Sequence, residues 1–338
     1  MKGDDSSTAN SGFCLPGLFG VPQQVSHGQE PVGTFEASLS SINNAKAFPH
    51  GGFIQAEGGS LLTSTYWLSE QADEFRSHLK RRPWLKLSQR TISKAVSLPL
   101  YWSSNYYHWI CDVLPRLRLI SSLEPSRLQF LVPHPFKQWM VDSLRCFDIS
   151  ESQCIPIRGP LSYKIKTLLF PEPLAMTGDH DEEALKWTRS KILGATATFP
   201  ACNSKRIYVS RRQAIGRRIV NEQELLKILK AHNFEIIEAE NLTFSDQMKK
   251  FSEATLILAP HGAGLTNMIA ARQNCKVIEI FEPSIIRRCY FQMARSLQLD
   301  YGCVVGLPVA NSQGEPDIFL PAEILIGLNS LLGFQTKG

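Results

Sequence analysis

The feature that most constrains the fold is a regular alternation of short apolar runs and amphipathic segments in the second half of the chain. The apolar runs have the length of buried strands, and the segments between them repeat hydrophobic residues at helical spacing. Parallel strands joined by crossover helices form a sheet that is covered on both faces. We therefore predict a doubly wound α/β domain with strands at 206–210, 234–238, 255–259, 276–281 and 301–305 and helices at 221–232, 244–253, from 263, 286–297 and 321–334.

The first half of the chain shows a second series of the same kind. Strand-like runs at 94–100, 127–132, 154–157 and 164–170 alternate with helical segments at 106–120 and 135–147. A stretch rich in small and polar residues, 194–205, separates the two series. These patterns predict a loosely ordered extension over residues 1–45, an N-terminal α/β domain over 46–195 and a C-terminal α/β domain over 200–338.

Composition and charge exclude several classes of protein. The 338 residues carry 36 Lys and Arg against 31 Asp and Glu, and the net charge of +5 is too mild for a nucleic-acid binder with a basic stripe. The 8 cysteines are scattered without a Cys-x-x-Cys pair, which argues against a zinc site or a disulfide framework. The N-terminus has no apolar signal segment, so we expect a cytoplasmic protein, with peripheral membrane contact left open.

The stretch Ala-Pro-His-Gly-Ala-Gly-Leu-Thr-Asn at 259–267 lies between a predicted strand and a predicted helix. Glycine lets backbone N–H groups approach a ligand, and the first N–H groups of a helix attract anions. This pattern makes candidate phosphate ligands of His261, Gly262, Ala263 and Gly264. A tight turn without a ligand is the alternative interpretation.

Two charged residues fall near the carboxyl ends of other predicted strands. Arg211 follows the strand at 206–210, and Glu279 lies in the strand at 276–281. A guanidinium suits a diphosphate, and a carboxylate can accept hydrogen bonds from ribose hydroxyls. Arg212 is typical of a solvated loop. For Glu279, structural capping and ribose binding are both open.

A row of polar residues interrupts the apolar helical segment at 104–117. His108 and Asp112 are four residues apart and share one face of a helix, and Asn105 and Arg116 extend the row. A carboxylate that fixes the tautomer of an imidazole makes the pair suitable for general base catalysis. A hydrogen-bonded network on the helix surface is the alternative, and Pro115 predicts a kink.

Asp179 and Asp181 form an Asp-x-Asp pattern just before a predicted helix. Such a pattern could hold a divalent metal beside a diphosphate. Acids that precede a helix also cap its first N–H groups. We predict a cap here and no metal site.

The linked motifs resemble glycosyltransferase family 61, a group of capsular-polysaccharide-type transferases that includes plant xylosyltransferases and animal O-linked GlcNAc transferases. The resemblance is carried by Asn-Tyr-Tyr-His-Trp-Ile-Cys-Asp-Val-Leu-Pro-Arg-Leu at 105–117, Arg-Ile-Tyr-Val-Ser-Arg-Arg at 206–212, the turn at 259–269 and Val-Ile-Glu-Ile-Phe at 277–281. It covers about residues 94–283, and residues 1–50 lie outside it.

The resemblance implies an α/β fold of the GT-B type, with two Rossmann-like doubly wound domains that face a cleft. It implies inverting transfer, without a metal or other cofactor, from a nucleotide-sugar donor to a glycan or lipid-linked glycan in polysaccharide biosynthesis. A UDP-sugar is the first choice of donor. The absence of an apparent secretory signal departs from the animal members and argues against a protein acceptor of the secretory pathway.

Site residues follow from the same resemblance, position by position. The C-terminal domain would hold the donor diphosphate through Arg211 and the turn at 261–264, with Glu279 near the ribose. The acceptor side, in the N-terminal domain, would be lined by Asn105, His108, Asp112 and Arg116. The base would be either His108 or Asp112.

Two rival functions share parts of the pattern. Gly262 and Gly264 with an acid on the next strand imitate the fingerprint of an NAD(P)-dependent oxidoreductase. However, Asn267 stands at the third glycine position, and the motif follows the third strand of its domain instead of the first. A sugar-nucleotide or glycan-binding module without turnover would use the same residue types.

Overall fold

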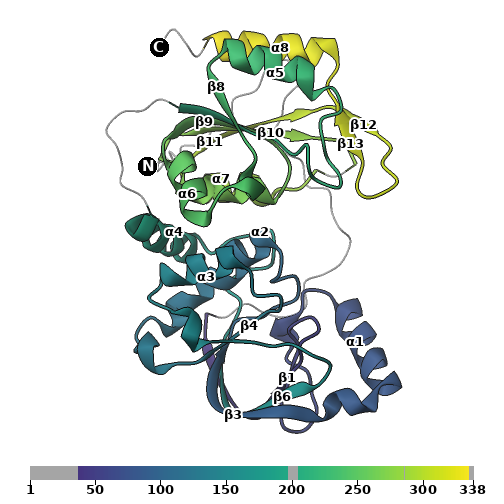
Figure 1. The fold of residues 1–338 in the computed structure, drawn as a ribbon, viewed down its shortest axis with the longest axis vertical. Helices are drawn as coiled ribbons and strands as arrows, with labels where there is room; N and C mark the ends of the chain where they lie inside the picture. The colour runs from purple at the N-terminus through teal and green to yellow at the C-terminus, as the bar shows by residue number, and fades with distance from the viewer. Residues whose placement is uncertain (1–36, 197–204, 285, 335–338) are drawn as a thin grey trace, which may run out of the picture. The chain divides into compact units, whose positions relative to one another are not determined.

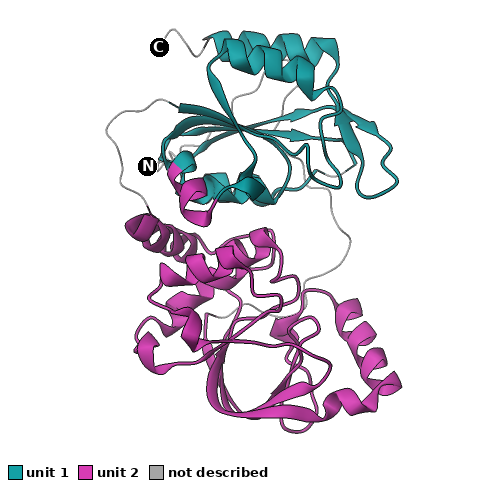
Figure 2. Cartoon of the chain, viewed as in Figure 1, with its two compact units in different colours: residues 1–25, 199–242, 250–338 teal, residues 26–198, 243–249 magenta. Residues whose placement is uncertain are grey.

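The computed structural model describes residues 37–196, 205–284 and 286–334. These residues form two compact units (Figure 2). The N-terminal unit contains the described residues up to 196 together with 243–249, and the C-terminal unit contains 205–242 and 250–334. Both units combine helices with parallel strands, which confirms the α/β class.

The C-terminal unit is built on a parallel five-stranded sheet with the order β11-β10-β9-β7-β8. The chain therefore starts in the sheet with β7, adds β8 on one side, and then crosses to the other side of β7 to add β9. The two neighbours β7 and β9 flank the topological switch point, where ligands bind in open α/β sheets. The strands are β7 (Lys205–Val209), β8 (Phe234–Ile237), β9 (Ala254–Pro260), β10 (Lys276–Phe281) and β11 (Asp300–Val305).

Helices cover both faces of this sheet, as Figure 1 shows for α5 and α8 on one face and α7 on the other. The face under α5 and α8 is an aliphatic core formed by residues such as Leu225, Leu258, Ile280 and Leu328. Because side chains alternate along a strand, the neighbouring positions of β9, β10 and β11 point to the opposite face. The helices of this unit are α5 (Glu222–Ala231), η7 (Ala239–Asn241), η8 (Ala263–Ala270), α7 (Cys289–Ser296) and α8 (Ala322–Phe334). Helix α6 (Phe244–Ser252) follows η7, and most of it belongs to the N-terminal unit.

A small antiparallel pair, which the sequence analysis did not predict, precedes the last helix. Strands β12 (Leu307–Val309) and β13 (Asp317–Phe319) pair with each other, and Ile219 forms a parallel bridge to Ile318. The segment that follows Arg211 is thereby attached to β13. Three-residue strands carry too short a pattern to be separated from loops by periodicity.

The N-terminal unit contains a six-stranded mixed sheet with the order β2-β1-β6-β3-β4-β5. Strands β6, β3, β4 and β5 run parallel, whereas β1 pairs antiparallel with both β2 and β6. The expectation of a purely doubly wound sheet is therefore wrong for this unit, because an antiparallel strand needs no crossover helix. The strands are β1 (Leu39–Ala47), β2 (Ile54–Gln55), β3 (Ser88–Ser97), β4 (Phe130–Val132), β5 (Cys154–Pro156) and β6 (Ser162–Pro171).

Strand β1 also corrects the expected N-terminal extension. Residues 1–36 lie outside the described residues, but 39–45, which were assigned to the same loose extension, form most of β1. The strand is rich in Ser and Asn and is exposed at several positions, so it lacks the apolar alternation that identifies a strand. Its place in the sheet depends on pairing with β6, which is distant in sequence.

The helical elements of the N-terminal unit include α1, whose buried face packs on Phe48 and Phe53 in a small aromatic core. The segment from Tyr106 to Ile120 is helical throughout but changes its winding twice. The elements are η1 (Thr63–Thr65), α1 (Ser69–Arg81), η2 (Pro83–Lys86), α2 (Tyr106–His108), η3 (Trp109–Val113), η4 (Leu114–Ile120), η5 (Pro125–Arg127), α3 (Gln138–Arg145), η6 (Glu151–Gln153) and α4 (Glu182–Thr196).

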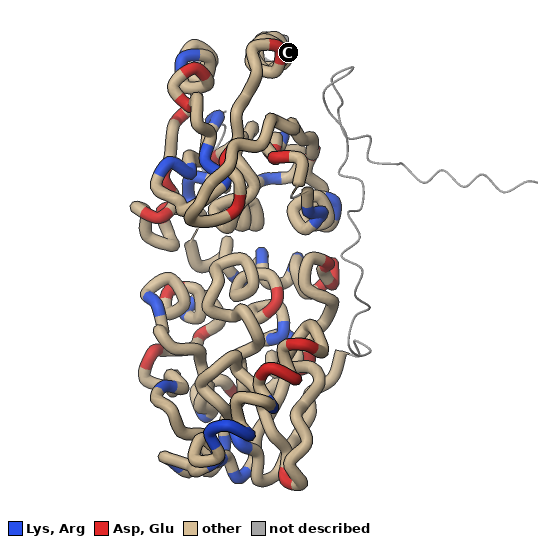
Figure 3. The backbone as a smooth tube through the Cα atoms, turned by 90° about the vertical axis from the view of Figure 1, so that its right-hand side faces the viewer, with Lys and Arg blue, Asp and Glu red and all other residues tan. Residues whose placement is uncertain are grey.

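Charged residues of both signs are interspersed along both units (Figure 3). This distribution agrees with the mild net charge of +5. Within the part of the chain that the structure describes, every helix is too short or too polar to cross a bilayer.

Asp317 gives the C-terminal unit a testable dependence on pH. Its buried carboxylate accepts hydrogen bonds from the backbone N–H of Arg218 at 2.8 Å and from the Arg218 side chain at 2.6 Å. Burial alone would raise the pKa of Asp317, but these hydrogen bonds outweigh burial and lower the pKa below its usual 3.8. Folding therefore gains stability from this group above its unfolded pKa and loses it as the pH falls through the folded value.

We expect Asp317→Asn to be less stable than the wild type at pH 7 and the two free energies of unfolding to converge below about pH 4. Urea unfolding at a series of pH values, followed by circular dichroism, measures both curves. Parallel curves for the two proteins would show that the Asp317–Arg218 pair does not contribute to acid sensitivity.

Candidate functional site

The turn after β9 lies at the switch point of the C-terminal sheet. The N–H of His261 still bonds to the carbonyl of Ile280 on β10 at 2.9 Å, so the strand pairing continues up to the turn. Gly262 follows, and η8 begins at Ala263. This helix is a 3₁₀ helix over eight residues instead of the expected α-helix, but its first N–H groups likewise have no partner within the helix.

Arg211, which follows β7, packs directly on this turn. A Cβ atom added at Gly262 would lie 1.9 Å from Nη1 of Arg211 and 2.6 Å from its Cζ. The backbone of Gly262 is extended, with φ 168°, and any residue can adopt that conformation. Glycine is therefore needed here for space, because the guanidinium occupies the position of a side chain. The structure thus brings together two segments that the sequence places about 50 residues apart.

The guanidinium of Arg211 is a poorly compensated buried cation. Its Nη2 donates to the carbonyl of Gly216 at 3.1 Å, whereas its buried Nε has no partner among the described residues. Burial and the neighbouring Arg217 lower the pKa of Arg211 to about 10. The group is still protonated at neutral pH, and a buried cation next to free helix N–H groups attracts an anion.

Arg212 behaves differently, as the sequence analysis expected for a loop residue. Its side chain is 60% exposed and forms an ion pair with Glu238. The side chain of Arg211 is therefore buried against the turn, whereas that of the adjacent Arg212 is exposed, because the chain turns at the end of β7.

Glu279 is a buried acid of β10 that is engaged by two neighbouring side chains. It is 0% exposed, and its two oxygens accept hydrogen bonds from His261 Nδ1 and from the hydroxyl of Tyr301, the latter at 2.5 Å. These contacts favour the structural alternative for Glu279, and the position beside a ribose stays a prediction. Glu279 fixes the ring of His261, which also stacks on Phe281 with ring centroids 5.2 Å apart.

Tyr301 is a member of this cluster that the sequence analysis missed. Burial and the Glu279 carboxylate raise the pKa of Tyr301 well above its usual value, so the hydroxyl stays protonated and donates. The signal was present in the strand pattern: Val277 pairs with Tyr301, and alternation places Glu279 and Tyr301 on the same face. A buried acid in a strand needs a donor on the next strand.

The N-terminal unit contains the second cluster. His108 Nδ1 lies 2.7 Å from Oδ2 of Asp112, as the spacing of four residues predicts. Thr177, from the loop before α4, donates its hydroxyl to the same Asp112 oxygen at 2.8 Å and lies 3.1 Å from His108 Nδ1. The side chain of His108 is 19% exposed and that of Asp112 is 4% exposed. The carboxylate therefore orients the imidazole, and the imidazole is the group that a substrate can reach.

The other two members of the expected polar row do not line the same surface. Asn105 is the N-cap of α2, and its Oδ1 accepts from the N–H of Tyr107 at 2.9 Å. Arg116 is 0% exposed and donates to the carbonyls of Pro171, Leu98 and Ser97. Arg116 is therefore a structural residue, and the expected acceptor-side position is wrong for it.

The reason lies in the winding of the helical segment. Residues 109–113 form a π-helical turn and 114–120 a 3₁₀ helix that starts at Leu114 with Pro115 in its first turn. The wider turn followed by a tighter one rotates Arg116 away from the face of His108 and Asp112. A regular helix, which the spacing argument assumes, would have kept the row together.

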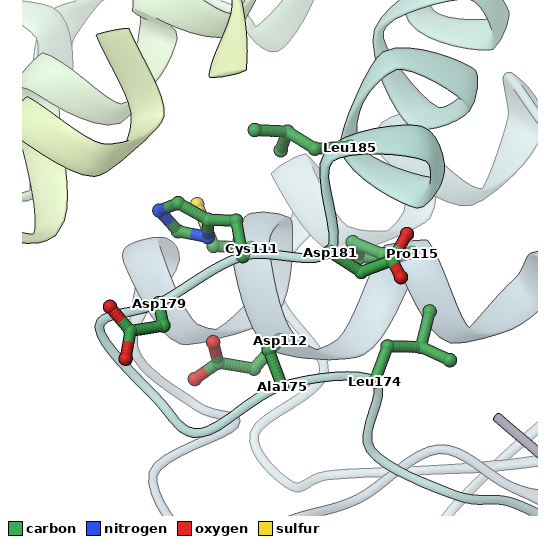
Figure 4. Close-up of a pocket in the computed structure, with 9 residues that line it drawn as sticks. Cys111, Asp112, Pro115, Leu174, Ala175, Asp179, Asp181 and Leu185 are labelled. Atoms are coloured by element: carbon green, nitrogen blue, oxygen red, sulfur yellow. The ribbon is translucent and has the colours of Figure 1, made fainter. Parts of the chain in front are cut away.

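A small pocket adjoins Asp112. Figure 4 shows it between the helical segment that carries Cys111, Asp112 and Pro115 and the loop that carries Leu174, Ala175 and Asp179. Asp181 accepts a hydrogen bond from the N–H of Ala184 at 2.7 Å, so it caps α4 as the sequence predicts. The described residues contain no group of three or more His, Cys, Asp or Glu side chains arranged to hold a metal ion.

The structure is an α/β protein with a glycine turn and a buried arginine at the switch point of one unit and a His–Asp pair in the other. The family model described as Glycosyltransferase 61 matches residues 106–278, which is 173 of the 338 residues. The chain belongs to glycosyltransferase family 61. The match contains both clusters except Glu279 and Tyr301.

A curated relative supports the same class. A beta-1,2-xylosyltransferase from Arabidopsis thaliana is 27% identical to the chain over 117 residues, which cover 30% of this chain and 21% of the relative. The aligned part spans about a fifth of the relative's length. The activity that the relative's name states is therefore attributed to that protein alone.

We expect Gly262→Ala to abolish the packing of Arg211 on the turn, because the new methyl group would occupy the place of the guanidinium. Binding of UDP, measured by isothermal titration calorimetry, should weaken at least tenfold while the circular dichroism spectrum is retained. Gly194→Ala is the matched control, since a Cβ at Gly194 meets nothing within 4 Å. Unchanged affinity in Gly262→Ala would show that the contact is not part of the binding site.

Proposed function

We propose that this protein is a glycosyltransferase that moves a sugar, with inversion and without a metal, from a nucleotide-sugar donor to a glycan or lipid-linked glycan acceptor. The observation that carries the proposal is the buried guanidinium of Arg211 against Gly262 at the switch point of a parallel sheet. A diphosphate suits both the guanidinium of Arg211 and the first N–H groups of η8. One of its oxygens can accept from the guanidinium while another accepts from these N–H groups.

The residues of the proposed donor site all belong to the C-terminal unit. Arg211 is stabilised by Gly216, and the turn is stabilised by Tyr290, whose hydroxyl donates to the carbonyl of Gly262 at 2.8 Å. As the bond between the sugar and the diphosphate breaks, negative charge grows on the diphosphate. Donors that are held in place before the reaction stabilise this charge without reorganisation. UDP is our first choice of nucleotide, from family membership.

His108 is the proposed base. Asp112 holds Nδ1, so Nε2 carries the lone pair that can take a proton from an acceptor hydroxyl. The deprotonated hydroxyl attacks the anomeric carbon from the face opposite the diphosphate, and the proton stays on His108 until the product leaves. Asp112 is less exposed and shares its Oδ2 with Thr177, so its role is to orient the imidazole.

The proposal includes the two-domain GT-B arrangement of the family. The donor cluster belongs to the C-terminal unit and the His–Asp pair to the N-terminal unit. The donor cluster lacks a base, and the His–Asp pair lacks a site for the donor diphosphate. Transfer would therefore need both units. A binding module without turnover is the rival that uses the same donor cluster, and a measured transfer distinguishes the two.

The donor site is tested by thermal shift with UDP, GDP and CDP, with and without a chelator. A nucleotide at a hundred times its dissociation constant should add ~2.7 kcal/mol to the free energy of unfolding. We expect one nucleotide to give this shift in the wild type and in Arg212→Ala but not in Arg211→Ala. The two arginine variants remove the same charge from adjacent positions, so equal loss in both would refute the assignment of Arg211.

Turnover provides the corresponding kinetic test. Removal of one oriented donor to a developing anion costs about a hundredfold or more in rate. We therefore expect Arg211→Ala to lower kcat/KM for the donor about a hundredfold and Arg212→Ala to lower it less than threefold, measured by release of the nucleoside diphosphate.

We expect His108→Ala to lower transfer by about 10²–10⁴-fold, because a general base contributes that much, while UDP affinity is retained. Asp112→Asn should give a smaller loss, since the imidazole is still present but is less well oriented. His232→Ala is the control, because His232 bonds to Asn329 on the surface of the C-terminal unit. Full activity of His108→Ala would remove the proposed base.

A further inference from the structure

Trp102 combines a large exposed ring with an unusual backbone conformation. Its side chain is among the exposed large hydrophobic groups of the described residues, at 42% exposure. Its φ is +67°, in the left-handed region that bulky residues rarely adopt. A residue in this conformation is less stable than it would be in an ordinary one, so its retention calls for a reason.

The neighbouring contacts explain how this conformation is maintained. The N–H of Tyr101 bonds to the carbonyl of Thr65 at 3.0 Å, and the indole of Trp67 donates to the carbonyl of Tyr101 at 3.2 Å. On the other side, the carbonyl of Trp102 accepts from the N–H of Asn105, the N-cap of α2, at 2.8 Å. The turn is therefore fixed at both ends, but none of these contacts uses the indole ring of Trp102.

The ring of Trp102 lies beside the proposed base. The centroids of the Trp102 and His108 rings are 5.2 Å apart, with an interplanar angle of 34°. Tyr101 packs edge-on against the same indole at 5.5 Å, which fixes the direction of the ring. An exposed aromatic face thus adjoins the group that would take a proton from the acceptor.

We propose that Trp102 is the stacking platform for the acceptor sugar. One face of a pyranose ring carries several C–H groups and is apolar, and it packs on the face of an indole while the hydroxyls at its rim stay free to hydrogen bond. A sugar stacked on Trp102 would present a rim hydroxyl to His108 Nε2. The inference depends on the proposed function, and it specifies the acceptor as a sugar with an accessible apolar face.

The left-handed conformation makes a sharp genetic test possible. Trp102→Gly removes the ring and places glycine where φ is positive, a conformation that glycine adopts without strain. We expect the melting temperature to stay the same or rise, the KM for the acceptor to rise at least tenfold and the KM for the donor to change less than twofold. Trp102→Phe, which retains a smaller ring, should lie between Trp102→Gly and the wild type.

Trp84 is the matched control. It is another exposed tryptophan of the N-terminal unit, at 53% exposure, but it lies on η2. Trp84→Ala should leave both KM values unchanged. A lower melting temperature in Trp102→Gly with an unchanged acceptor KM would show that Trp102 has a purely structural role and would overturn the inference. A raised donor KM with an unchanged acceptor KM would overturn it as well.

A binding measurement separates this inference from the proposed function. The protein is labelled with 5-fluorotryptophan, and the ¹⁹F resonance of Trp102 is identified by its loss in Trp102→Phe. The probes are the methyl β-glycosides of xylose, glucose, galactose, mannose and N-acetylglucosamine, each added with and without UDP. We expect at least one of them to shift the Trp102 resonance and to leave the Trp84 resonance in place.

The two failures are then distinguishable. If the wild type transfers no sugar from any nucleotide donor but a glycoside still shifts Trp102, the proposed function fails and the sugar platform stands. If none of the glycosides shifts Trp102, the platform is refuted, whether or not transfer is observed.

Discussion

The contact on which the switch point of the C-terminal unit depends is the packing of the Arg211 guanidinium on the backbone of Gly262. It joins the ends of β7 and β9, which are neighbours in the sheet only because the chain reverses its direction of growth between β8 and β9. A side chain at position 262 would exclude the guanidinium, and a residue other than arginine at 211 would leave the turn without its charge. The order of the strands, the glycine at 262 and the guanidinium of Arg211 therefore depend on one another, and the proposed diphosphate would supply the anion that this buried cation attracts.

Glu279 and Tyr301 form the layer that supports this arrangement. The carboxylate is wholly buried, and each of its oxygens has a donor, which is the condition under which a buried charge is tolerated. His261 therefore enters the turn with its Nδ1 already engaged and with its ring stacked on Phe281. Glu279, which the sequence motif suggests as a donor ligand, instead holds the ring of His261 in place through Nδ1.

The sequence predicted the elements of the C-terminal unit well, because its buried strands are rich in β-branched residues and are separated by helices with a clear apolar face. It also predicted the pairing of His108 with Asp112, the cap at Asp181 and the difference between Arg211 and Arg212. Sheet order, the polar strand β1 and the short pair β12 and β13 depend on long-range pairing, which local patterns do not encode. Arg116 was misplaced because the spacing argument assumed a regular helix where the chain forms a π-turn.

Two unfavourable local conformations occur within the twelve residues from Trp102 to Val113: a tryptophan in the left-handed region and a π-helical turn. The first does not serve to bury the core, since the side chain of Trp102 is 42% exposed. Both, however, change the direction of side chains around His108: the first places an indole face beside the imidazole, and the second separates the His–Asp pair from Arg116. Conformations that are costly for the fold but consistent in their effect on one residue are typical of functional sites. The local backbone of the N-terminal unit is thus consistent with the proposed role of His108, and this observation does not depend on a sequence motif.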